Sequence, residues 1–401
     1  MRGCRLPETS RKLGETWAER ASGYARRMLR WALSFMVVLA CLGACSSTPL
    51  PPAPGSDAGS DGPVPDATPG DGPTPDTQTV TVFDAARISS DASSANFQRL
   101  TADIDLTGGP YQRVTLQAEL GTTCFPFSAW QNDPPPSGQN FPADCDAFDR
   151  NFELALDEPE ADSGAPPGLE LVRAITPFGG PMQLEHDLTA LANALPGPHR
   201  LSARINTYSD AAGLITGSNG GWDVSVRLEL VKGAPPRQPL AIIPLFYGDL
   251  TTESGASASF SAPSGTRSAY IEYRTTGHGQ AAGDTLQCNG PAEEFCKRAH
   301  TIQLDGTVLK TFTPWQSCAS ECTLLSDADA GFSYCAENPL GDVASVKAAR
   351  AHWCPGSESP PIILDSPALA VPGAHELSWQ VSEIAAGGSV RVSVTYYAFA
   401  D

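Results

Sequence analysis

The stretch "WDVSVRLELV" at residues 222–231 decides the fold, because its apolar and polar side chains alternate with a period of two. Its apolar side chains stand at every second position, namely Trp222, Val224, Val226, Leu228 and Leu230. Successive side chains of a β-strand point to opposite faces of a sheet. The stretch therefore predicts a strand with one face in a core and the other toward solvent.

Similar near-alternation recurs along the rest of the chain. It is found at 79–85, 111–120 and 198–208, then, after a turn-rich break at 232–239, at 240–248, 267–276, 300–312, 375–382 and 389–399. Asp305-Gly306 between apolar alternations is a strong hairpin signal, and the best helix candidate, at 188–195, is short. These segments predict an all-β protein of two tandem antiparallel sandwiches, at residues 80–235 and 236–401.

Composition and charge narrow the class of protein. The chain has 401 residues, of which 18% are charged, with 37 Gly and 36 Pro. Such a mixture is typical of loop-rich exported β proteins. Beyond the first 44 residues there are 18 basic and 42 acidic side chains, a net charge near −24. That charge repels phosphate backbones and argues against nucleic acid as a partner.

The N-terminus indicates export. Arg26, Arg27 and Arg30 precede an apolar run too short to span a membrane, and "LGAC" at 42–45 resembles the bacterial lipobox. We expect residues 1–45 to be a lipoprotein signal region with Cys45 lipidated, and the protein to reside at the outer membrane or cell surface. An ordinary cleaved signal peptide is the alternative, and Met28 is an alternative start.

Residues 46–79 are expected to form a disordered tether. Its Pro/Gly/Asp-rich part, 46–77, contains no aromatic and no basic residue. It has too little apolar surface to offset the entropy lost on ordering. We therefore expect a spacer that holds a monomeric globular body away from the membrane, which the chain contacts through the lipid alone.

The two predicted sandwiches, residues 80–401, contain an even number of cysteines. An even set in an exported chain indicates disulfides rather than a metal site, and no common zinc spacing is present. No metal or cofactor is expected. Nearest-neighbour pairing is one of the arrangements that the sequence allows: Cys124 with Cys145, Cys288 with Cys296, Cys318 with Cys322, and Cys335 with Cys354.

The segment "DCDAFDRN" at 144–151 raises a question of function. It places three Asp within six residues, one of them directly before an Arg. A solvated acidic turn and a carboxylate placed for catalysis are both compatible with these residues alone.

Further motifs favour catalysis. They are "RAITPF" (173–178), "GHG" (277–279), "EEFCKRAHTIQLDG" (293–306) and "RAHWCPG" (350–356). Together with "CDAFDR" (145–150), in this order, they make the chain similar to the peptide-N-glycosidase F family over residues 80–401. Five weak motifs in one order are fairly specific.

The resemblance implies two jelly-roll-type sandwiches packed side by side and a metal-free site between them. It implies hydrolysis of the amide between asparagine and N-acetylglucosamine in N-linked glycoproteins or glycopeptides. Asp149 matches the principal catalytic carboxylate, and Glu294 one that assists through water, although Glu293 competes for that register. Arg350 and Trp353 match residues that contribute to the same cleft in the family. On chemical grounds, Arg150 can orient Asp149 or bind a sugar oxygen, and the faces of Trp353, Phe148 and Phe295 suit a sugar ring, although Phe148 and Phe295 stand where the family has Trp. The resemblance also implies the 124/145, 288/296 and 335/354 disulfides.

The chain departs from the family pattern at one carboxylate. Where the family has a third active-site Glu, Tyr208 stands, and Asp210 two residues later is a candidate substitute on the same face of a strand. A catalytically silent glycan-binding or adhesive lipoprotein is therefore the alternative function. Copper chemistry is disfavoured, because the mature chain has a single Met, Met182, and no His-x-His. Within 144–151, we predict that Asp149 is essential and that Asp144 and Asp146 are solvated.

Overall fold

A computed structural model describes residues 76–121, 124, 134–159, 165–208, 210–251, 255–280, 288, 290, 292–327 and 332–401. The signal region, Cys45 and nearly all of the tether lie outside these residues. The first strand begins at Thr77, which pairs with Val231, so the segment expected as tether ends before residue 79.

The first sandwich consists of two four-stranded antiparallel sheets. One sheet has the order β1 (Thr77–Ser89), β8 (Gly221–Lys232), β3 (Tyr111–Gly121), β6 (Met182–Asp187). The other has the order β2 (Arg99–Asp105), β7 (Pro198–Ile205), β4 (Asn151–Leu156), β5 (Leu169–Ile175). The expected short helix is α2 (Thr189–Ala194), which packs its apolar side against this core.

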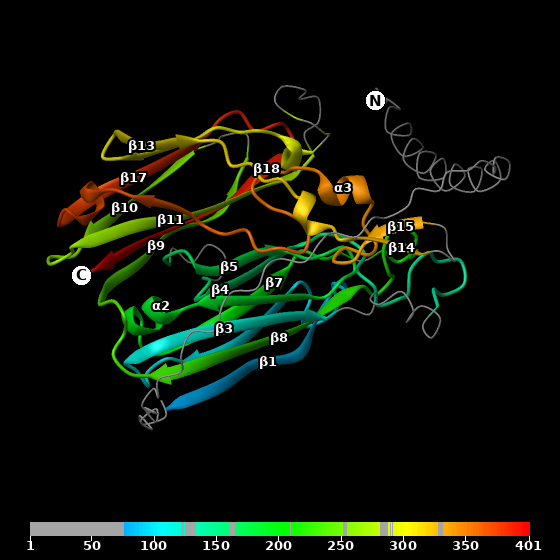
Figure 1. The fold of residues 1–401 in the computed structure, drawn as a ribbon, viewed down its shortest axis with the longest axis horizontal. Helices are drawn as coiled ribbons and strands as arrows, with labels where there is room; N and C mark the ends of the chain where they lie inside the picture. Colours follow the sequence, from blue (N-terminus) through cyan, green and yellow to red (C-terminus); the bar gives the residue numbers. More distant parts are fainter. Residues whose placement is uncertain are drawn as a thin grey trace, which may run out of the picture. The chain divides into compact units, whose positions relative to one another are not determined.

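The second sandwich also has two four-stranded sheets, and in Figure 1 its strands run from light green to red. Their orders are β10 (Gly255–Ala262), β17 (Gly373–Val381), β12 (His300–Leu304), β13 (Thr307–Phe312), and β16 (Ile362–Asp365), β11 (Ser268–Gly279), β18 (Gly388–Phe399), β9 (Pro239–Leu250). The hairpin predicted at Asp305-Gly306 joins β12 to β13, with positive φ at both residues. The predicted all-β double sandwich is confirmed.

Short elements lie in the connections of the second sandwich. The 3-10 turn η2 (Glu293–Phe295) precedes β12. After β13 come the 3-10 turn η3 (Ala319–Glu321), the two-stranded sheet β14 (Leu324–Asp327) and β15 (Phe332–Cys335), the helix α3 (Val343–Lys347) and the 3-10 turn η4 (Pro367–Ala370). No helix in the described part of the chain is long and apolar enough to cross a membrane.

The two sandwiches bury a shared face. In β8 the apolar side chains alternate as predicted, with Trp222, Val224 and Val226 fully buried. In β18, by contrast, both faces are buried. Tyr396 belongs to the core of the second sandwich, whereas Phe399 packs with the core of the first. Strand β18 thus contributes to both cores and joins the two sandwiches.

Buried charges cross this shared face as well. Glu153 of β4 accepts hydrogen bonds from Arg391 of β18, at 3.0 Å from Nε and 2.9 Å from Nη2. Arg173 of β5 is fully buried, pairs with Glu170, and donates to the carbonyl oxygen of Arg391 at 2.7 Å. Isolated buried ions are costly, and here each of these charges has a partner where the two sandwiches meet.

Candidate active site

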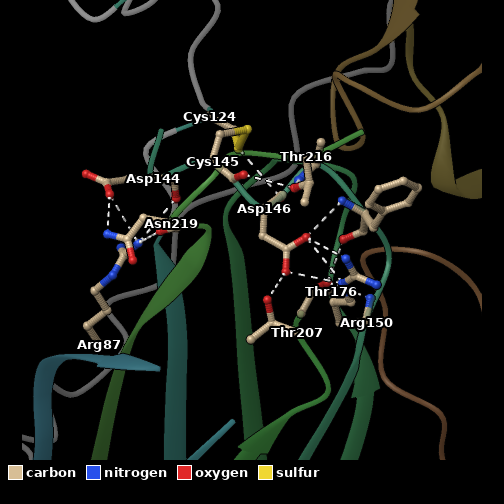
Figure 2. The surroundings of a disulfide bond; sticks show 12 residues. Arg87, Cys124, Asp144, Cys145, Asp146, Arg150, Thr176, Thr207, Thr216 and Asn219 are labelled. Atoms are coloured by element: carbon tan, nitrogen blue, oxygen red, sulfur yellow. Dashed lines mark hydrogen bonds and ion pairs between the residues drawn. A yellow bond between two sulfur atoms is a disulfide. The ribbon is translucent and has the colours of Figure 1, made fainter. Parts of the chain in front are cut away.

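The loop that carries residues 144–151 lies between β3 and β4, and the Cys124–Cys145 disulfide fixes its start (Figure 2). Asp144 is half exposed and lies 3.6 Å from Arg87, as expected for a surface acid. Asp146 contradicts the prediction, because it is fully buried. The prediction assumed an extended segment, but the Phe148 amide donates back to Asp146 Oδ1 at 3.3 Å and turns the chain inward.

Asp149 and Glu294 come from different sandwiches and meet around one arginine. Arg350 Nη2 lies 4.0 Å from Asp149 Oδ2, and Arg350 Nε lies 3.6 Å from Glu294 Oε1. Burial and, after it, the charge of Glu294 raise the pKa of Asp149 to about 7, against the opposing charges of Arg350 and Arg150. Burial also raises the pKa of Glu294, which Arg350 opposes. The two carboxyl groups can therefore differ in protonation near neutral pH.

Glu293 and Glu294 take separate places. Glu293 is fully buried and accepts from Arg298 Nη2 at 3.0 Å and from the amide of Ala385 at 3.2 Å. Glu294 keeps about a fifth of its side chain exposed. Its carbonyl oxygen accepts the Ala351 amide at 2.7 Å, which ties the loop of Glu294 to that of Arg350. The structure thus brings Glu294, and not Glu293, to Asp149.

Arg350 is held rigidly from the second sandwich. Its Nη1 donates to the carbonyl oxygens of Ser345 and Ala348 at 2.7 and 2.9 Å. Its guanidinium carbon lies 5.0 Å from the ring centroid of Phe295 and 4.8 Å from that of Trp353. These contacts fix the cation before a ligand arrives, which is the condition for electrostatic preorganisation.

On the first sandwich, Arg150 packs against two aromatic rings, as Arg350 does on the second. Its guanidinium carbon lies 4.8 Å from the Phe148 ring centroid and 4.4 Å from that of Tyr208. Its backbone is fixed by Thr176, whose hydroxyl accepts the Arg150 amide at 2.8 Å. Thr176 lies within "RAITPF", and its role in fixing Arg150 does not follow from that motif alone.

Asp210 does not replace the third carboxylate. It lies in a loop rather than on a strand, and its Oδ2 accepts the backbone amides of Leu214 and Ile215 at 2.8 and 2.7 Å. These backbone bonds, opposed by slight desolvation, lower the pKa of Asp210. Its carboxylate holds its own loop, while the neighbouring Tyr208 keeps 40% of its surface exposed.

A cleft of about 140 Å³ lies between Asp149 and Glu294. Its lining comprises Asp149, Arg150, Asn151, Ile175, Asn206, His278, Glu294 and Trp353. His278 stacks on Trp353 and hydrogen bonds with Thr276 Oγ1 at 2.8 Å, and burial lowers its pKa to about 3, so the ring is neutral. Asn151, Asn206 and His278 were not predicted as site residues; His278 was visible in "GHG". Among the described residues, no group of His, Cys, Asp or Glu is placed to hold a metal ion.

Two disulfides match nearest-neighbour pairing, Cys124–Cys145 and Cys288–Cys296, and two do not. In place of the expected Cys318–Cys322 and Cys335–Cys354, the second of which the resemblance also implied, the structure has Cys318–Cys354 and Cys322–Cys335. The β14–β15 hairpin pairs Leu324 with Cys335 and so brings Cys322 beside it. The isolated β-bridge between Gln316 and Arg350 brings the segment that contains Cys354 close to Cys318. Contacts between distant segments, not chain proximity, set both pairings.

Comparison with known proteins agrees with this architecture. Residues 246–396 match the family model described as peptide-N-glycosidase F, C terminal. The second sandwich is therefore similar to the C-terminal domain of that family, and the resemblance predicted from the sequence is confirmed. No curated protein matches the chain.

Solved structures share the whole double sandwich. The chain is similar to PNGase F, a glycosylasparaginase from Flavobacterium meningosepticum, with 17% identity, a TM-score of 0.58, and coverage of 80% of this chain and 96% of that one. It is similar to PNGF-II with 18% identity and a TM-score of 0.57, covering 80% of this chain and 65% of that longer one. At these identities the likeness establishes the fold.

Proposed function

We propose that the protein hydrolyses the amide bond between asparagine and the first N-acetylglucosamine of N-linked glycans. The observation that carries the proposal is the meeting of Asp149 and Glu294, from separate sandwiches, within 4.0 Å of the buried Arg350. The family match of the second sandwich supports the same chemistry.

In the proposed reaction, water adds to the amide carbon, and the carbon–nitrogen bond breaks. The products are an aspartate side chain and a glycosylamine that has gained a proton. Glu294, the carboxyl group that is ionised, accepts a proton from the attacking water. Asp149, the one that is protonated, donates its proton to the leaving nitrogen. The raised pKa of Asp149 suits it to hold that proton near neutral pH. Arg350 stabilises the charge that develops on the amide oxygen.

The walls of the cleft suit a sugar attached to a peptide. Asn206, in the lining of the cleft, offers an amide for hydroxyl groups. The exposed ring of Tyr208 offers an apolar face, whereas Trp353 is buried under His278 and Arg350 and supports the cleft from behind. Arg150 also lines the cleft. We infer that the partner is an N-linked glycoprotein or glycopeptide, that the protein acts as a monomer, and that Cys45 anchors it in the outer membrane.

A second candidate function is a silent glycan-binding lipoprotein. One observation favours it: Tyr208 stands where the family has a carboxylate, and Asp210 is held by its own loop. In that case the cleft would bind glycopeptides without cleaving them.

Incubation of the full chain with a denatured N-glycoprotein tests the two functions. We expect release of glycan and conversion of asparagine to aspartate, a mass increase of about one dalton on the peptide. Asp149→Asn should lower the rate by about 10²–10⁴-fold, as expected for loss of a general acid. Asp144→Asn, in the same loop but toward Arg87, is the matched control and should keep the wild-type rate. Binding of glycopeptide without release would support the second function instead.

A further inference from the structure

Asp146 is a fully buried carboxylate that the proposed reaction does not use. Figure 2 shows its two oxygens directed at Arg150 and Thr207. Arg150 Nε lies 3.2 Å from both oxygens and Nη2 lies 3.2 Å from Oδ1, while Thr207 Oγ1 donates to Oδ2 at 2.6 Å. A charge buried to this degree requires a partner, and Arg150 supplies it.

Arg150 stands between two acids. It follows Asp149 directly in the chain, yet it turns its guanidinium to Asp146, between the rings of Phe148 and Tyr208. In the part of the chain that the structure describes, the ion pair of Asp149 is with Arg350 at 4.0 Å, and none forms between Asp149 and Arg150. The geometry therefore divides the two arginines between two carboxylates.

We propose that Asp146 is a positioning residue, the counterion that keeps the charge of Arg150 paired between the two aromatic rings and withheld from Asp149. The inference rests on the proposed function in one respect: it takes Asp149 as the acid of the reaction. Asp146 itself touches no substrate in this scheme and acts through Arg150.

The electrostatics of the cleft give this arrangement a consequence. The charged and titratable groups that face Asp149 are Glu294, Arg350, Arg150 and His278, the last of them neutral. Burial and Glu294 raise the pKa of Asp149, whereas the two arginines lower it. When Asp146 is paired with Arg150, the charge of Arg150 lowers the pKa of Asp149 less than it would without that counterion.

Loss of the Asp146 charge should lower the pKa of Asp149. Asp146→Asn removes a negative charge near Asp149 and leaves Arg150 without its counterion, and both changes favour ionised Asp149. We therefore expect the midpoint of Asp149 to fall by about 1 pH unit or more. The basic limb of the rate profile should move to lower pH by the same interval. A role confined to stability would lower the unfolding midpoint and leave the titration where it is.

The experiment is a carbon-13 NMR titration of the full chain with labelled Asp carboxyl carbons, in which Asp149→Asn identifies the Asp149 signal. It compares wild type, Asp146→Asn, and Asp144→Asn as the control, whose midpoint for Asp149 should not change. An unchanged or raised midpoint in Asp146→Asn overturns the proposal. Because the titration needs no turnover, it distinguishes failure of this proposal from failure of the proposed amidase activity.

A second pair of variants decides the matter if Asp146→Asn does not fold. Arg150→Met alone leaves Asp146 uncompensated and should raise the midpoint of Asp149. Asp146→Asn with Arg150→Met removes both charges of the pair, which proteins tolerate better than removal of one. Its midpoint should return close to wild type. Equal midpoints in the single Arg150→Met variant and the double variant would refute a part for Asp146.

Discussion

Replacement of Glu153 by Gln is expected to lower the free energy of unfolding by about 3–5 kcal/mol at pH 7. The glutamate is buried where the sandwiches meet and accepts two charge-assisted hydrogen bonds from Arg391, at 3.0 and 2.9 Å. Such bonds contribute about 1.5–3 kcal/mol each. Gln retains one acceptor but turns an amide donor toward a guanidinium, so the largely buried Arg391 is left with too few partners.

The effect should depend on pH with a definite sign. Burial raises the pKa of Glu153, but the guanidinium groups of Arg391 and Arg173 outweigh this and hold the pKa below its ordinary value. A carboxyl with a depressed pKa stabilises the fold above its unfolded pKa, and that stabilisation is lost as pH falls through the folded value. The difference between wild type and Glu153→Gln should therefore be full near pH 7 and shrink below pH 4.5.

Urea denaturation at several pH values measures this difference, and Asp249→Asn is the control. Asp249 contacts the same Arg391 at 3.2 Å, but its side chain is 52% exposed, so its loss should cost at most about 1 kcal/mol. Equal costs for the two variants would refute the reasoning that burial, and not the contact alone, makes the Glu153 pair strong. If the stability difference between wild type and Glu153→Gln does not shrink at acid pH, the assignment of a negative charge to Glu153 is wrong.

The remaining predictions concern the catalytic acid, the disulfides and the anchor. Because the folded-state pKa of Asp149 is raised to about 7, its ionisation destabilises the fold as pH rises; Asp149→Asn should match wild type in thermal unfolding at low pH and exceed it at pH 8 by at least about 1 kcal/mol. A variant less stable than wild type at pH 8 would contradict this. Thiol titration of the denatured, unreduced protein should find no free thiol in the body, and non-reducing peptide mapping should find Cys318 with Cys354 and Cys322 with Cys335. Cys45→Ser should abolish membrane fractionation, and unchanged fractionation would exclude lipidation as the anchor.

The strands could be predicted from the sequence because the alternation of apolar and polar side chains is a local signal. The alternation at 222–231 follows directly from the pleat, and the Asp305-Gly306 turn follows from its need for positive φ. The burial of β18 on both faces was not predictable from its own residues. It depends on the first sandwich, which packs against Phe399.

The candidate site was predictable where motifs name a residue and not where folding sets its surroundings. Asp149 and Glu294 were placed by motif order. Asp146 was placed wrongly, because its burial depends on Thr207, which is 61 positions away, and on the turn made by Phe148. Spacing along the chain carries no information on such contacts.

The departure at Tyr208 affects recognition more than chemistry in the proposed reaction. Asp149, Glu294 and Arg350 form one group of contacts, and Tyr208 is absent from it. Tyr208 packs instead on Arg150, at 4.4 Å, and leaves its outer surface to solvent. An exposed ring backed by a cation presents an apolar face to a sugar, where a carboxylate would accept hydrogen bonds from hydroxyl groups. Under the proposed function, the chain therefore keeps the groups assigned to amide cleavage and changes the surface beside them that would meet the glycan.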